Sequence, residues 1–468
     1  MHCGYITTLN NVRKHPNADK LVLATCFVNT VCVNKDLYHE GEIGVYFPVD
    51  LQLSMEFCQK NGLLAVYENG INVSGGYMDP AKRNVKAIKL RGEQSDGLFL
   101  PLKCLEYTGV DMDSLNVGDT ITTVNGHEIC RKYIPRGKHH ATAAGGAGKR
   151  AKRKAKRSIA PVFYEHIDTE QLAYNLHMFK PGDLIEITRK LHGTSGRTSH
   201  TKVFQDMKRT FWDKLFRREG TPIYDWGYVS GTRRTVLDTF DGGFYGSNEF
   251  RKQYHDFFEG KLLKGETVYY EIVGFTHDGG SIMGVCDNKK LKDKEFVKKY
   301  GEKTVFSYGC SPNGKKTLHG MDEFGAFSVE ENVPQSDIYV YRMTMTNEDG
   351  EVVEYTPDQM RHRCMYMGVK TVPVHWYGFI PEHPGSHDDP TISAGEWVLK
   401  KAEQFYDGEE PIDPTHIREG VVVRVINRPT FTAYKHKNFQ FKVLEGIIKE
   451  CAEAPDMEEA DGLDEASE

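Results

Sequence analysis

Residues 185–197 read Ile185-Glu186-Ile187-Thr188-Arg189-Lys190-Leu191-His192-Gly193-Thr194-Ser195-Gly196-Arg197. The first half alternates apolar and polar side chains, as a half-buried strand does, and the second half is a glycine-containing turn. A single lysine, Lys190, stands at the end of the expected strand. An amine held at a strand end beside a tight turn can act as a nucleophile. The alternative is an ordinary surface lysine next to a β-turn.

Four segments further along the chain offer partners for such an amine. The segment 269–274 ends an apolar strand with the carboxylate of Glu271, which is suited to accept hydrogen bonds from ribose hydroxyls. The segment 337–342 places two aromatic side chains, including Tyr341, on one face of a strand, where a base can stack. Glu419 precedes an apolar strand and can hold a hydrated divalent cation. Lys435 and Lys437 alternate along a strand, so that both point at the same phosphates.

This order of segments resembles motifs I, III, IIIa, IV and V of the covalent nucleotidyltransferases, which are the RNA ligases, the DNA ligases and the mRNA capping enzymes. The sequences Lys-Leu-His-Gly-Thr-Ser at 190–195, Gly-Thr-Arg-Arg at 231–234, Phe-Ser-Tyr-Gly at 306–309 and Tyr-Lys-His-Lys at 434–437 are similar to those of the Deinococcus-type RNA ligases, RNA ligase family 5. The resemblance covers about residues 160–447 for catalysis and extends to the N-terminal region.

The resemblance implies a set of functional residues. Lys190 would attack the α-phosphorus of ATP to form lysyl-AMP, with Mg²⁺ or Mn²⁺ held through Glu419. The implied catalytic residues are Lys190, Glu271, Glu419, Lys435 and Lys437. The implied nucleotide pocket adds His192, Gly193, Arg233 and Tyr341 to these five. His192 stands where many relatives have Asp, so that ribose contact and a structural turn both remain open for it.

The composition indicates a globular protein. The chain has 468 residues, of which 39% are hydrophobic and 27% charged, and it contains neither a stretch of about 18 consecutive apolar residues nor a secretory signal pattern. We expect an intracellular, cytoplasmic protein without membrane association. The ten cysteines form no CxxC pair, which favours reduced, buried thiols.

Residues 1–130 read as short strands between Gly and Asn turns, which suggests a small barrel. The sequence His-Pro-Asn-Ala-Asp-Lys-Leu at 15–21 resembles the OB-fold tRNA-binding domains of some aminoacyl-tRNA synthetases. The predicted fold class is α+β, with an N-terminal OB-fold β-barrel followed by an ATP-grasp-like nucleotidyltransferase domain of antiparallel sheets flanked by helices. The barrel would contact RNA or shape the ligase site; turn and cap chemistry of any such barrel is the alternative.

Two charged segments nearly cancel in the net charge of −6. Residues 131–160 contain eleven Lys or Arg and no acid, whereas residues 450–468 contain nine acids and no base. We therefore expect an OB-like domain at 1–130, a basic flexible linker at 131–160, a nucleotidyltransferase domain at 161–449 and an acidic tail at 450–468. The linker could contact phosphates, act as a nuclear address in a eukaryote, or serve as a solvated spacer.

Within the third domain, two local patterns give further expectations. Apolar residues at three- and four-residue spacings from Val203 to Arg218 predict an amphipathic helix. The segment from Thr344 to Tyr366 has turn residues at 347–350, which predict a hairpin followed by an outer helix.

Among the enzymes that the sequence resembles, an ATP-dependent RNA ligase is the one we predict. DNA ligases and capping enzymes carry an OB domain after motif V, which needs about 80 residues or more, and about thirty residues follow Lys437. The substrate implied is RNA with 3′-hydroxyl and 5′-phosphate ends, as in a nicked duplex, and we expect a monomer. The alternatives are an RNA-binding protein with an inactive ligase fold and a capping guanylyltransferase, which would use GTP.

Overall fold

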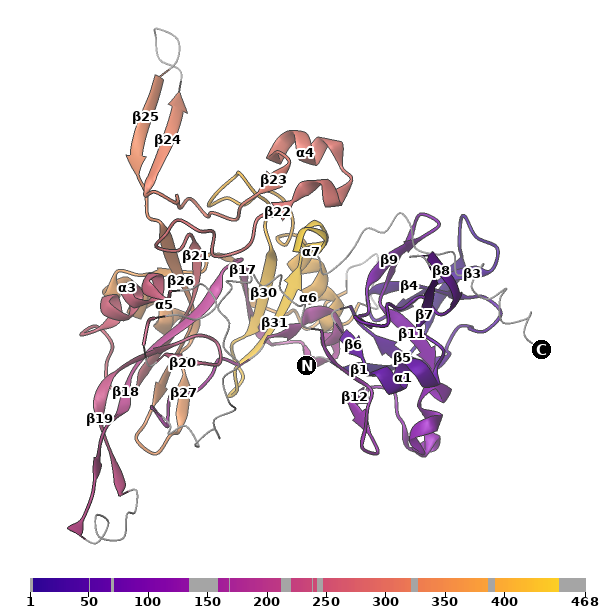
Figure 1. The fold of residues 1–468 in the computed structure, drawn as a ribbon, viewed down its shortest axis with the longest axis horizontal. Coiled ribbons are helices and arrows are strands. Elements are labelled where there is room, and N and C mark those ends of the chain that lie inside the picture. Colours follow the sequence, from indigo (N-terminus) through magenta and orange to yellow (C-terminus); the bar gives the residue numbers. More distant parts are fainter. Residues whose placement is uncertain are drawn as a thin grey trace. The chain divides into compact units, whose positions relative to one another are not determined.

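The computed structural model describes residues 3–49, 51–68, 71–133, 159–167, 169–211, 220–237, 239–241, 247–320, 327–385 and 392–445. The chain divides into two compact units (Figure 1). Unit 1 comprises Met1–Gly145, Lys289–Lys294 and Phe439–Glu468, and unit 2 comprises Gly146–Asn288 and Glu295–Asn438. Most of the expected basic linker and all of the acidic tail lie outside the described residues, so the domain boundaries predicted from the sequence stay predictions.

Unit 1 is built from short antiparallel strands, as the turn-rich sequence predicts. A four-stranded sheet has the order β11 (Leu98–Pro101), β5 (Ile43–Phe47), β1 (Gly4–Thr8), β12 (Thr120–Ile121). A three-stranded sheet contains β2 (Asn10–Lys14), β3 (Leu21–Cys26) and β4 (Asn29–Asn34). The remaining strands pair two by two: β15 (Cys130–Lys132) with β6 (Leu51–Leu53), β7 (Ala65–Glu68) with β8 (Ile71–Gly75), β9 (Ala87–Leu90) with β10 (Glu93–Asp96), and β13 (Thr123–Val124) with β14 (His127–Glu128). The pairings among described residues do not close into a barrel, so the OB fold stays a prediction.

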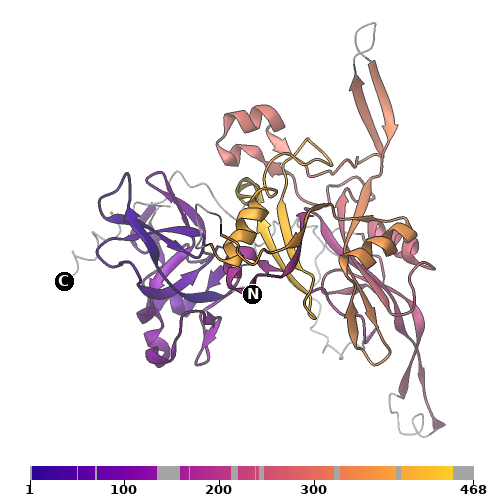
Figure 2. The ribbon, with the colours of Figure 1, turned by 180° about the vertical axis from the view of Figure 1, so that it is seen from behind.

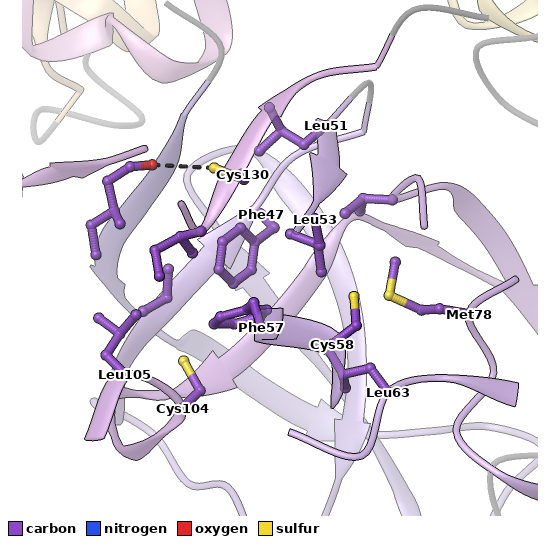
Figure 3. Packing of buried hydrophobic residues seen from close by; sticks show 14 of the residues in the cluster. Phe47, Leu51, Leu53, Phe57, Cys58, Leu63, Met78, Cys104, Leu105 and Cys130 are labelled. Atoms are coloured by element: carbon purple, nitrogen blue, oxygen red, sulfur yellow. Dashed lines mark hydrogen bonds between the residues drawn. The ribbon is translucent and has the colours of Figure 1, made fainter. Parts of the chain in front are cut away.

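The core of unit 1 forms between these small sheets, α1 (Met55–Lys60) and the 3₁₀ helix η1 (Leu102–Thr108). Phe47 and Phe57 lie at its centre with ring centroids 5.3 Å apart (Figure 3). Cys58, Cys104 and Cys130 also lie in this core, and burial raises the pKa of each thiol. All nine described cysteines are free and buried, which confirms the expectation of reduced thiols for them.

The His-Pro-Asn-Ala-Asp-Lys-Leu segment has a structural role in unit 1. A ring nitrogen of buried His15 lies 3.1 Å from the Leu90 carbonyl oxygen, and Asn17 Nδ2 donates to the Arg91 carbonyl at 2.9 Å. Both contacts hold the turn between β9 and β10. These two side chains therefore fit the turn-chemistry alternative given above.

The helix α7 (Phe439–Glu445) belongs to unit 1, although it follows the last strand of unit 2 almost directly. Val443 is buried against Ala87, with Val49, Leu291 and Phe439 packed around them. The apolar face of this short helix is thus part of the unit 1 structure.

Unit 2 contains two large sheets, of which the first has five strands. Its order is β16 (Glu170–Gln171), β31 (Thr432–Lys437), β30 (Gly420–Val425), β17 (Leu184–Lys190), β29 (Val374–Phe379). Ile185 and Ile187 of β17 face a core shared with α6 (Ala394–Glu403). By alternation Glu186, Thr188 and Lys190 lie on the other face.

The second sheet has seven strands. Its main path is β20 (Val236–Leu237), β19 (Thr221–Gly231), β18 (Thr194–Lys208), β21 (Glu266–Gly274), β26 (Ser336–Thr346), β27 (Val352–Glu354), and β28 (Lys370–Thr371) pairs in parallel with β26. The helices α3 (Glu249–Phe258) and α5 (Pro357–Met367) bury one face of it. The predicted hairpin and outer helix at 344–366 are confirmed by β26, β27 and α5.

Polar contacts join the first sheet to the α5 region of the second. Arg361 of α5 pairs with buried Glu186 of β17, and Arg424 of β30 donates to the Tyr355 carbonyl at 2.9 Å. These contacts hold the polar face of the first sheet against α5 and the residue that precedes its N-cap. Smaller elements of unit 2 are β22 (Cys286–Asp287), β23 (Lys303–Thr304) and α4 (Lys294–Tyr300). The first residue of α4 is the last residue of a unit 1 segment. β24 (Lys315–Gly320) and β25 (Phe327–Asn332) form a projecting hairpin (Figure 1).

The helix predicted from Val203 to Arg218 is wrong for Val203 to Lys208. Val203 to Lys208 belong to β18 and pair with β19, and residues 212–219 lie outside the described residues. A β-bulge between Phe204 and Asp206 adds one residue to the strand. The bulge converts a two-residue alternation into a three-residue step from Phe204 to Met207, which imitates helical spacing. Within the described chain, no helix is long and apolar enough to cross a membrane.

Candidate active site

Lys190 is the last residue of β17, at the end predicted from the sequence, and it pairs with Gly420, the first residue of β30. Lys437, the last residue of β31, pairs with Gly420 from the other side. Neighbouring strand ends therefore bring together three segments that lie far apart in the sequence. A Cβ at Gly420 would lie 2.1 Å from the His436 carbonyl oxygen, so that only glycine permits this close approach.

The carboxylate of Glu419 lies at the centre of these strand ends. Its Oε1 is 2.6 Å from Lys190 Nζ and 3.3 Å from Lys437 Nζ, and Oε2 is 3.9 Å from Nδ1 of His192. Glu419 is only 1% exposed. Burial disfavours its charged form, but Lys190 and Lys437 outweigh that effect and hold the pKa of Glu419 at about 2. The carboxylate is thus ionised at every physiological pH.

The second oxygen of Glu419 is a candidate ligand for a cation. Glu419 Oε2 is buried and accepts no hydrogen bond from any described residue. Buried polar atoms without partners are uncommon in native proteins and call for an explanation such as an ion. A carboxylate oxygen is a preferred ligand of Mg²⁺ and Mn²⁺. This oxygen of Glu419 is therefore a candidate for one ligand of a divalent cation.

Glu271 approaches from the second sheet. Ser195 Oγ of β18 donates to Glu271 Oε2 of β21 at 3.3 Å. Burial raises the pKa of Glu271 to about 7, with nearby Glu419 adding to the shift while Lys190 and Arg233 oppose it. These mutual effects place Glu271 in the same electrostatic environment as Lys190 and Glu419.

Gly193 determines how closely the turn after Lys190 can approach β21. A Cβ at this position would lie 2.3 Å from the Ile272 carbonyl oxygen and 2.9 Å from Glu271 Cγ. Any larger residue would push the turn away from the strand that carries Glu271. The glycine in the sequence pattern therefore has a direct steric reason.

Tyr341 lies on β26 beside Glu271. Tyr339 is the cross-strand partner of Glu271. The pairing of β21 with β26 shifts register between Tyr269 and Tyr270, and Tyr341 lies opposite this shift. Burial raises the pKa of Tyr341, and Glu271 raises it further, whereas Ser195 and Arg233 lower it. Tyr341 and Arg233 thus belong to the same site as Glu271.

Lys435 is placed differently from Lys437. It is half-buried on β31, pairs with Val422, and shares a strand face with Lys437 by alternation. The structure thus gathers Lys190, His192, Gly193, Arg233, Glu271, Tyr341, Glu419 and Lys437 around one point, and it places Lys435 one step further along the same face.

Two residues without a role assigned from sequence organise the turn after Lys190. The Tyr308 hydroxyl accepts a hydrogen bond from the His192 backbone N–H at 2.7 Å. Tyr308 adopts a φ of 49°, which is rare for a non-glycine residue. The Asp413 carboxylate holds the Tyr308 segment by accepting from Ser307 Oγ at 2.5 Å and from the Gly309 N–H at 2.8 Å. Tyr308 stands within the quoted Phe-Ser-Tyr-Gly pattern, whereas no sequence signal marked Asp413.

The side of β17 away from the site carries a buried ion pair. Arg189 Nη1 donates to Glu410 Oε1 at 2.7 Å, and both residues are buried. Glu410 and Asp413 belong to the loop that leads to Glu419, and the Asp413 N–H donates to the Glu410 carbonyl at 3.1 Å. The loop that presents Glu419 is therefore fastened to the strand that presents Lys190.

Comparison with solved structures shows the same fold in an RNA ligase of Naegleria gruberi. A structure of that ligase with pyrophosphate has a TM-score of 0.51 and 15% identity, and the match covers 94% of this chain and 98% of the other. A mutant of the same ligase with ATP and Mn has a TM-score of 0.52 and 15% identity, with the same coverage of both chains. This chain has an RNA ligase fold. No protein-family model matches the sequence, and no curated protein matches it.

Proposed function

We propose that this chain is an ATP-dependent RNA ligase that forms a lysyl-AMP at Lys190. The observation that carries the proposal is the meeting of Lys190, Glu419 and Lys437 at adjacent strand ends, with Glu271 reaching the same point from the second sheet. The shared fold with a ligase solved with ATP and Mn supports the same chemistry. Binding RNA 5′-phosphate and 3′-hydroxyl ends, as at a nick in a duplex, would be its task.

In the first step, the Nζ lone pair of Lys190 forms an N–P bond with the α-phosphorus of ATP. The bond from that phosphorus to the bridging oxygen breaks, and pyrophosphate leaves with the electron pair. Lys190 must lose a proton to solvent before this attack, and its Nζ lies 2.6 Å from Glu419 Oε1.

Glu419 would hold a Mg²⁺ or Mn²⁺ ion through its unpaired Oε2. Such an ion supplies positive charge that favours the neutral amine and the departing phosphate. Lys437 forms an ion pair with the same carboxylate and would contact the phosphates. Lys435 lies on the same strand as Lys437. Arg233 adds a cation near Glu271. These residues would supply positive charge to the phosphates of the bound nucleotide.

Glu271 and Tyr341 would bind the nucleoside. A carboxylate accepts hydrogen bonds from the two ribose hydroxyls, and an aromatic ring offers a surface for adenine. The backbone of His192 is held by Tyr308, which favours the structural-turn alternative for this residue. After adenylation, AMP would pass to an RNA 5′-phosphate, and a 3′-hydroxyl would then displace AMP and seal the strand.

The similarity to Deinococcus-type ligases, the OB fold of residues 1–130 and the four-domain division are part of the same proposal. They rest on the sequence patterns, as do the intracellular location and the monomeric state. An inactive ligase fold is disfavoured because the nucleophile, the carboxylates and the lysines are all present and, apart from Lys435, are gathered at one point.

Incubation with α-labelled ATP and Mg²⁺, followed by denaturing electrophoresis, tests the proposal. A labelled protein band that releases AMP to 5′-phosphorylated nicked RNA is the expected result. Labelling by GTP in place of ATP would instead identify a capping guanylyltransferase. The absence of labelling with either nucleotide would leave an RNA-binding protein with an inactive ligase fold.

A further inference from the structure

The outer halves of β18 and β19 form a two-stranded ribbon that projects from the rest of its sheet (Figures 1 and 2). Three cross-strand pairs follow one another along one face of this ribbon, because they recur at every second residue. These pairs are His200 with Tyr228, Lys202 with Trp226, and Phe204 with Tyr224. We call this surface, defined by these six residues, the aromatic face.

The rings of the aromatic face contact one another along the ribbon. His200 stacks on Tyr228 with ring centroids 4.4 Å apart and an interplanar angle of 16°. Phe204 and Tyr224 pack edge to face at 6.1 Å. All six side chains of the aromatic face are half-exposed. Half-exposed rings in a row are the arrangement on which successive bases of a single strand stack.

Positive charge lies on the same face. Lys202 Nζ lies 4.8 Å from the Trp226 ring centroid, and Lys264 Nζ lies 5.4 Å from it. The exposed carboxylates of the ribbon, Asp206 and Asp225, pair across the strands with Ile223 and Val203 on the opposite face. Among the described residues, Lys202 pairs with one acidic side chain, Glu348 at 3.8 Å, which is itself 68% exposed. Lys202 and Lys264 therefore place positive charge on the aromatic side of the ribbon, whereas both carboxylates lie on the other side together with Lys208.

The aromatic face is separate from the candidate active site. Ser195, at the near end of β18, contacts Glu271, whereas Thr198 contacts Tyr270 on the opposite side of the sheet. His200 follows Thr198 by two residues and therefore shares its side. Lys202 is seven residues beyond Ser195, or about 23 Å at 3.3 Å per residue. A nucleic acid held at both places must extend several nucleotides away from the reacting ends.

We propose that the aromatic face binds single-stranded RNA that flanks the ligation site, with bases on the rings and phosphates on Lys202 and Lys264. This inference rests on the proposed RNA ligase function. A protein partner is the less suitable occupant, because the centres of protein interfaces are depleted in lysine. Base stacking is tolerant of sequence, so the face would recognise an unpaired strand of any sequence.

Binding of a fluorescent single-stranded RNA to the full chain tests the inference directly. Trp226→Ala should weaken this binding about 10-fold, because stacking on one ring contributes on the order of 1–3 kcal/mol. Ile223→Ala, a change of an exposed residue on the opposite face of the same ribbon, should leave the dissociation constant unchanged. Trp226→Ala should weaken the binding of nicked duplex RNA only when this duplex carries a single-stranded overhang.

A second variant avoids any loss of packing in the ribbon. Lys202→Gln with Lys264→Gln keeps every ring and should lower the slope of log affinity against log salt by about 1.4, since each phosphate contact on a single strand contributes about 0.7. Thermal melting of each variant serves as the folding control. The rate of lysyl-AMP formation should stay at the wild-type value in all of them.

Three outcomes separate this inference from its alternatives. The inference would be overturned if folded Trp226→Ala bound single-stranded RNA with the wild-type affinity. A change of sedimentation behaviour without a change of RNA affinity would make the face a protein interface and would also overturn it. Weakened RNA binding in a protein that never forms lysyl-AMP would support the aromatic face as an RNA site while refuting the ligase function.

Discussion

The Lys190 ammonium lies 2.6 Å from Oε1 of Glu419, and this carboxylate is almost completely buried. The pair joins the end of β17 to the start of β30. In this arrangement the amine of the proposed nucleophile is held in position beside the carboxylate. A divalent cation held by Glu419 would supply positive charge beside the Lys190 amine.

Glu419→Gln should abolish adenylation while the chain still folds. Lys190 and Lys437 would then face each other without their shared anion, and removing one partner of a buried pair costs about 3 kcal/mol of unfolding free energy. We expect at least a 100-fold lower rate of lysyl-AMP formation. Because the pKa of Glu419 is about 2, the defect should be equal at pH 6 and pH 9.

Glu409→Gln is the matched control for Glu419→Gln. Glu409 lies in the same loop, but its pair with Lys299 is exposed and contributes less than about 1 kcal/mol. Equal activity of Glu419→Gln and Glu409→Gln would contradict the role given to Glu419.

Glu271→Gln should change how stability depends on pH. The folded protein holds the Glu271 proton up to about pH 7, whereas the unfolded chain releases it near the ordinary value of 4.5. The wild type therefore loses stability relative to the variant as pH rises from 5 to 8, by on the order of 2–3 kcal/mol. Urea unfolding at both pH values measures this difference. If the difference in unfolding free energy between wild type and variant were the same at both pH values, burial would not raise the pKa of Glu271.

Gly193→Ala should impair the site more than the fold. The added Cβ would lie 2.3 Å from the Ile272 carbonyl oxygen, so that the turn after Lys190 must move away from Glu271. We expect a destabilisation of about 1–3 kcal/mol and a loss of adenylation of about 100-fold or more. Gly284→Ala is the control, because nothing lies within 4 Å of a Cβ there. Wild-type labelling rates in folded Gly193→Ala would count against the site geometry.

Asp413→Ala tests whether the loop before Glu419 organises the nucleophile. The change removes the acceptor for Ser307 Oγ and the Gly309 N–H, and leaves these donors unpaired at a cost of about 2–3 kcal/mol. Tyr308 would then hold the His192 backbone less firmly. We expect slower lysyl-AMP formation at saturating ATP, measured by single-turnover labelling. Asp413→Asn, which can still accept one hydrogen bond, should recover part of the rate.

The sequence predicted the parts of the site that carry a local pattern. Lys190 and Lys437 end strands with alternating side chains, and Glu271 and Glu419 stand in or next to apolar strands, so that these strands could be predicted. The order of these segments identified a fold that the comparison with solved structures supports.

The remaining features depend on contacts between distant segments. Asp413 lies in a turn whose sequence resembles many others, and only the packed loop brings its carboxylate to the Tyr308 segment. The bulge after Phe204 made a strand look helical, because it shifted the alternation by one residue. Strand pairing in unit 1 likewise depends on long-range register, which the turn pattern does not determine.

Mass-spectrometric peptide mapping after incubation with ATP and Mg²⁺ tests the central claim most directly. The account predicts AMP on the peptide that contains Lys190, linked through its Nζ, and no adenylated peptide from Lys190→Ala. The variant should nonetheless seal pre-adenylated nicked RNA to some extent, because Glu271, Glu419 and Lys437 remain. AMP attached to another residue, or undiminished adenylation of folded Lys190→Ala, would contradict the assignment of Lys190 as the nucleophile.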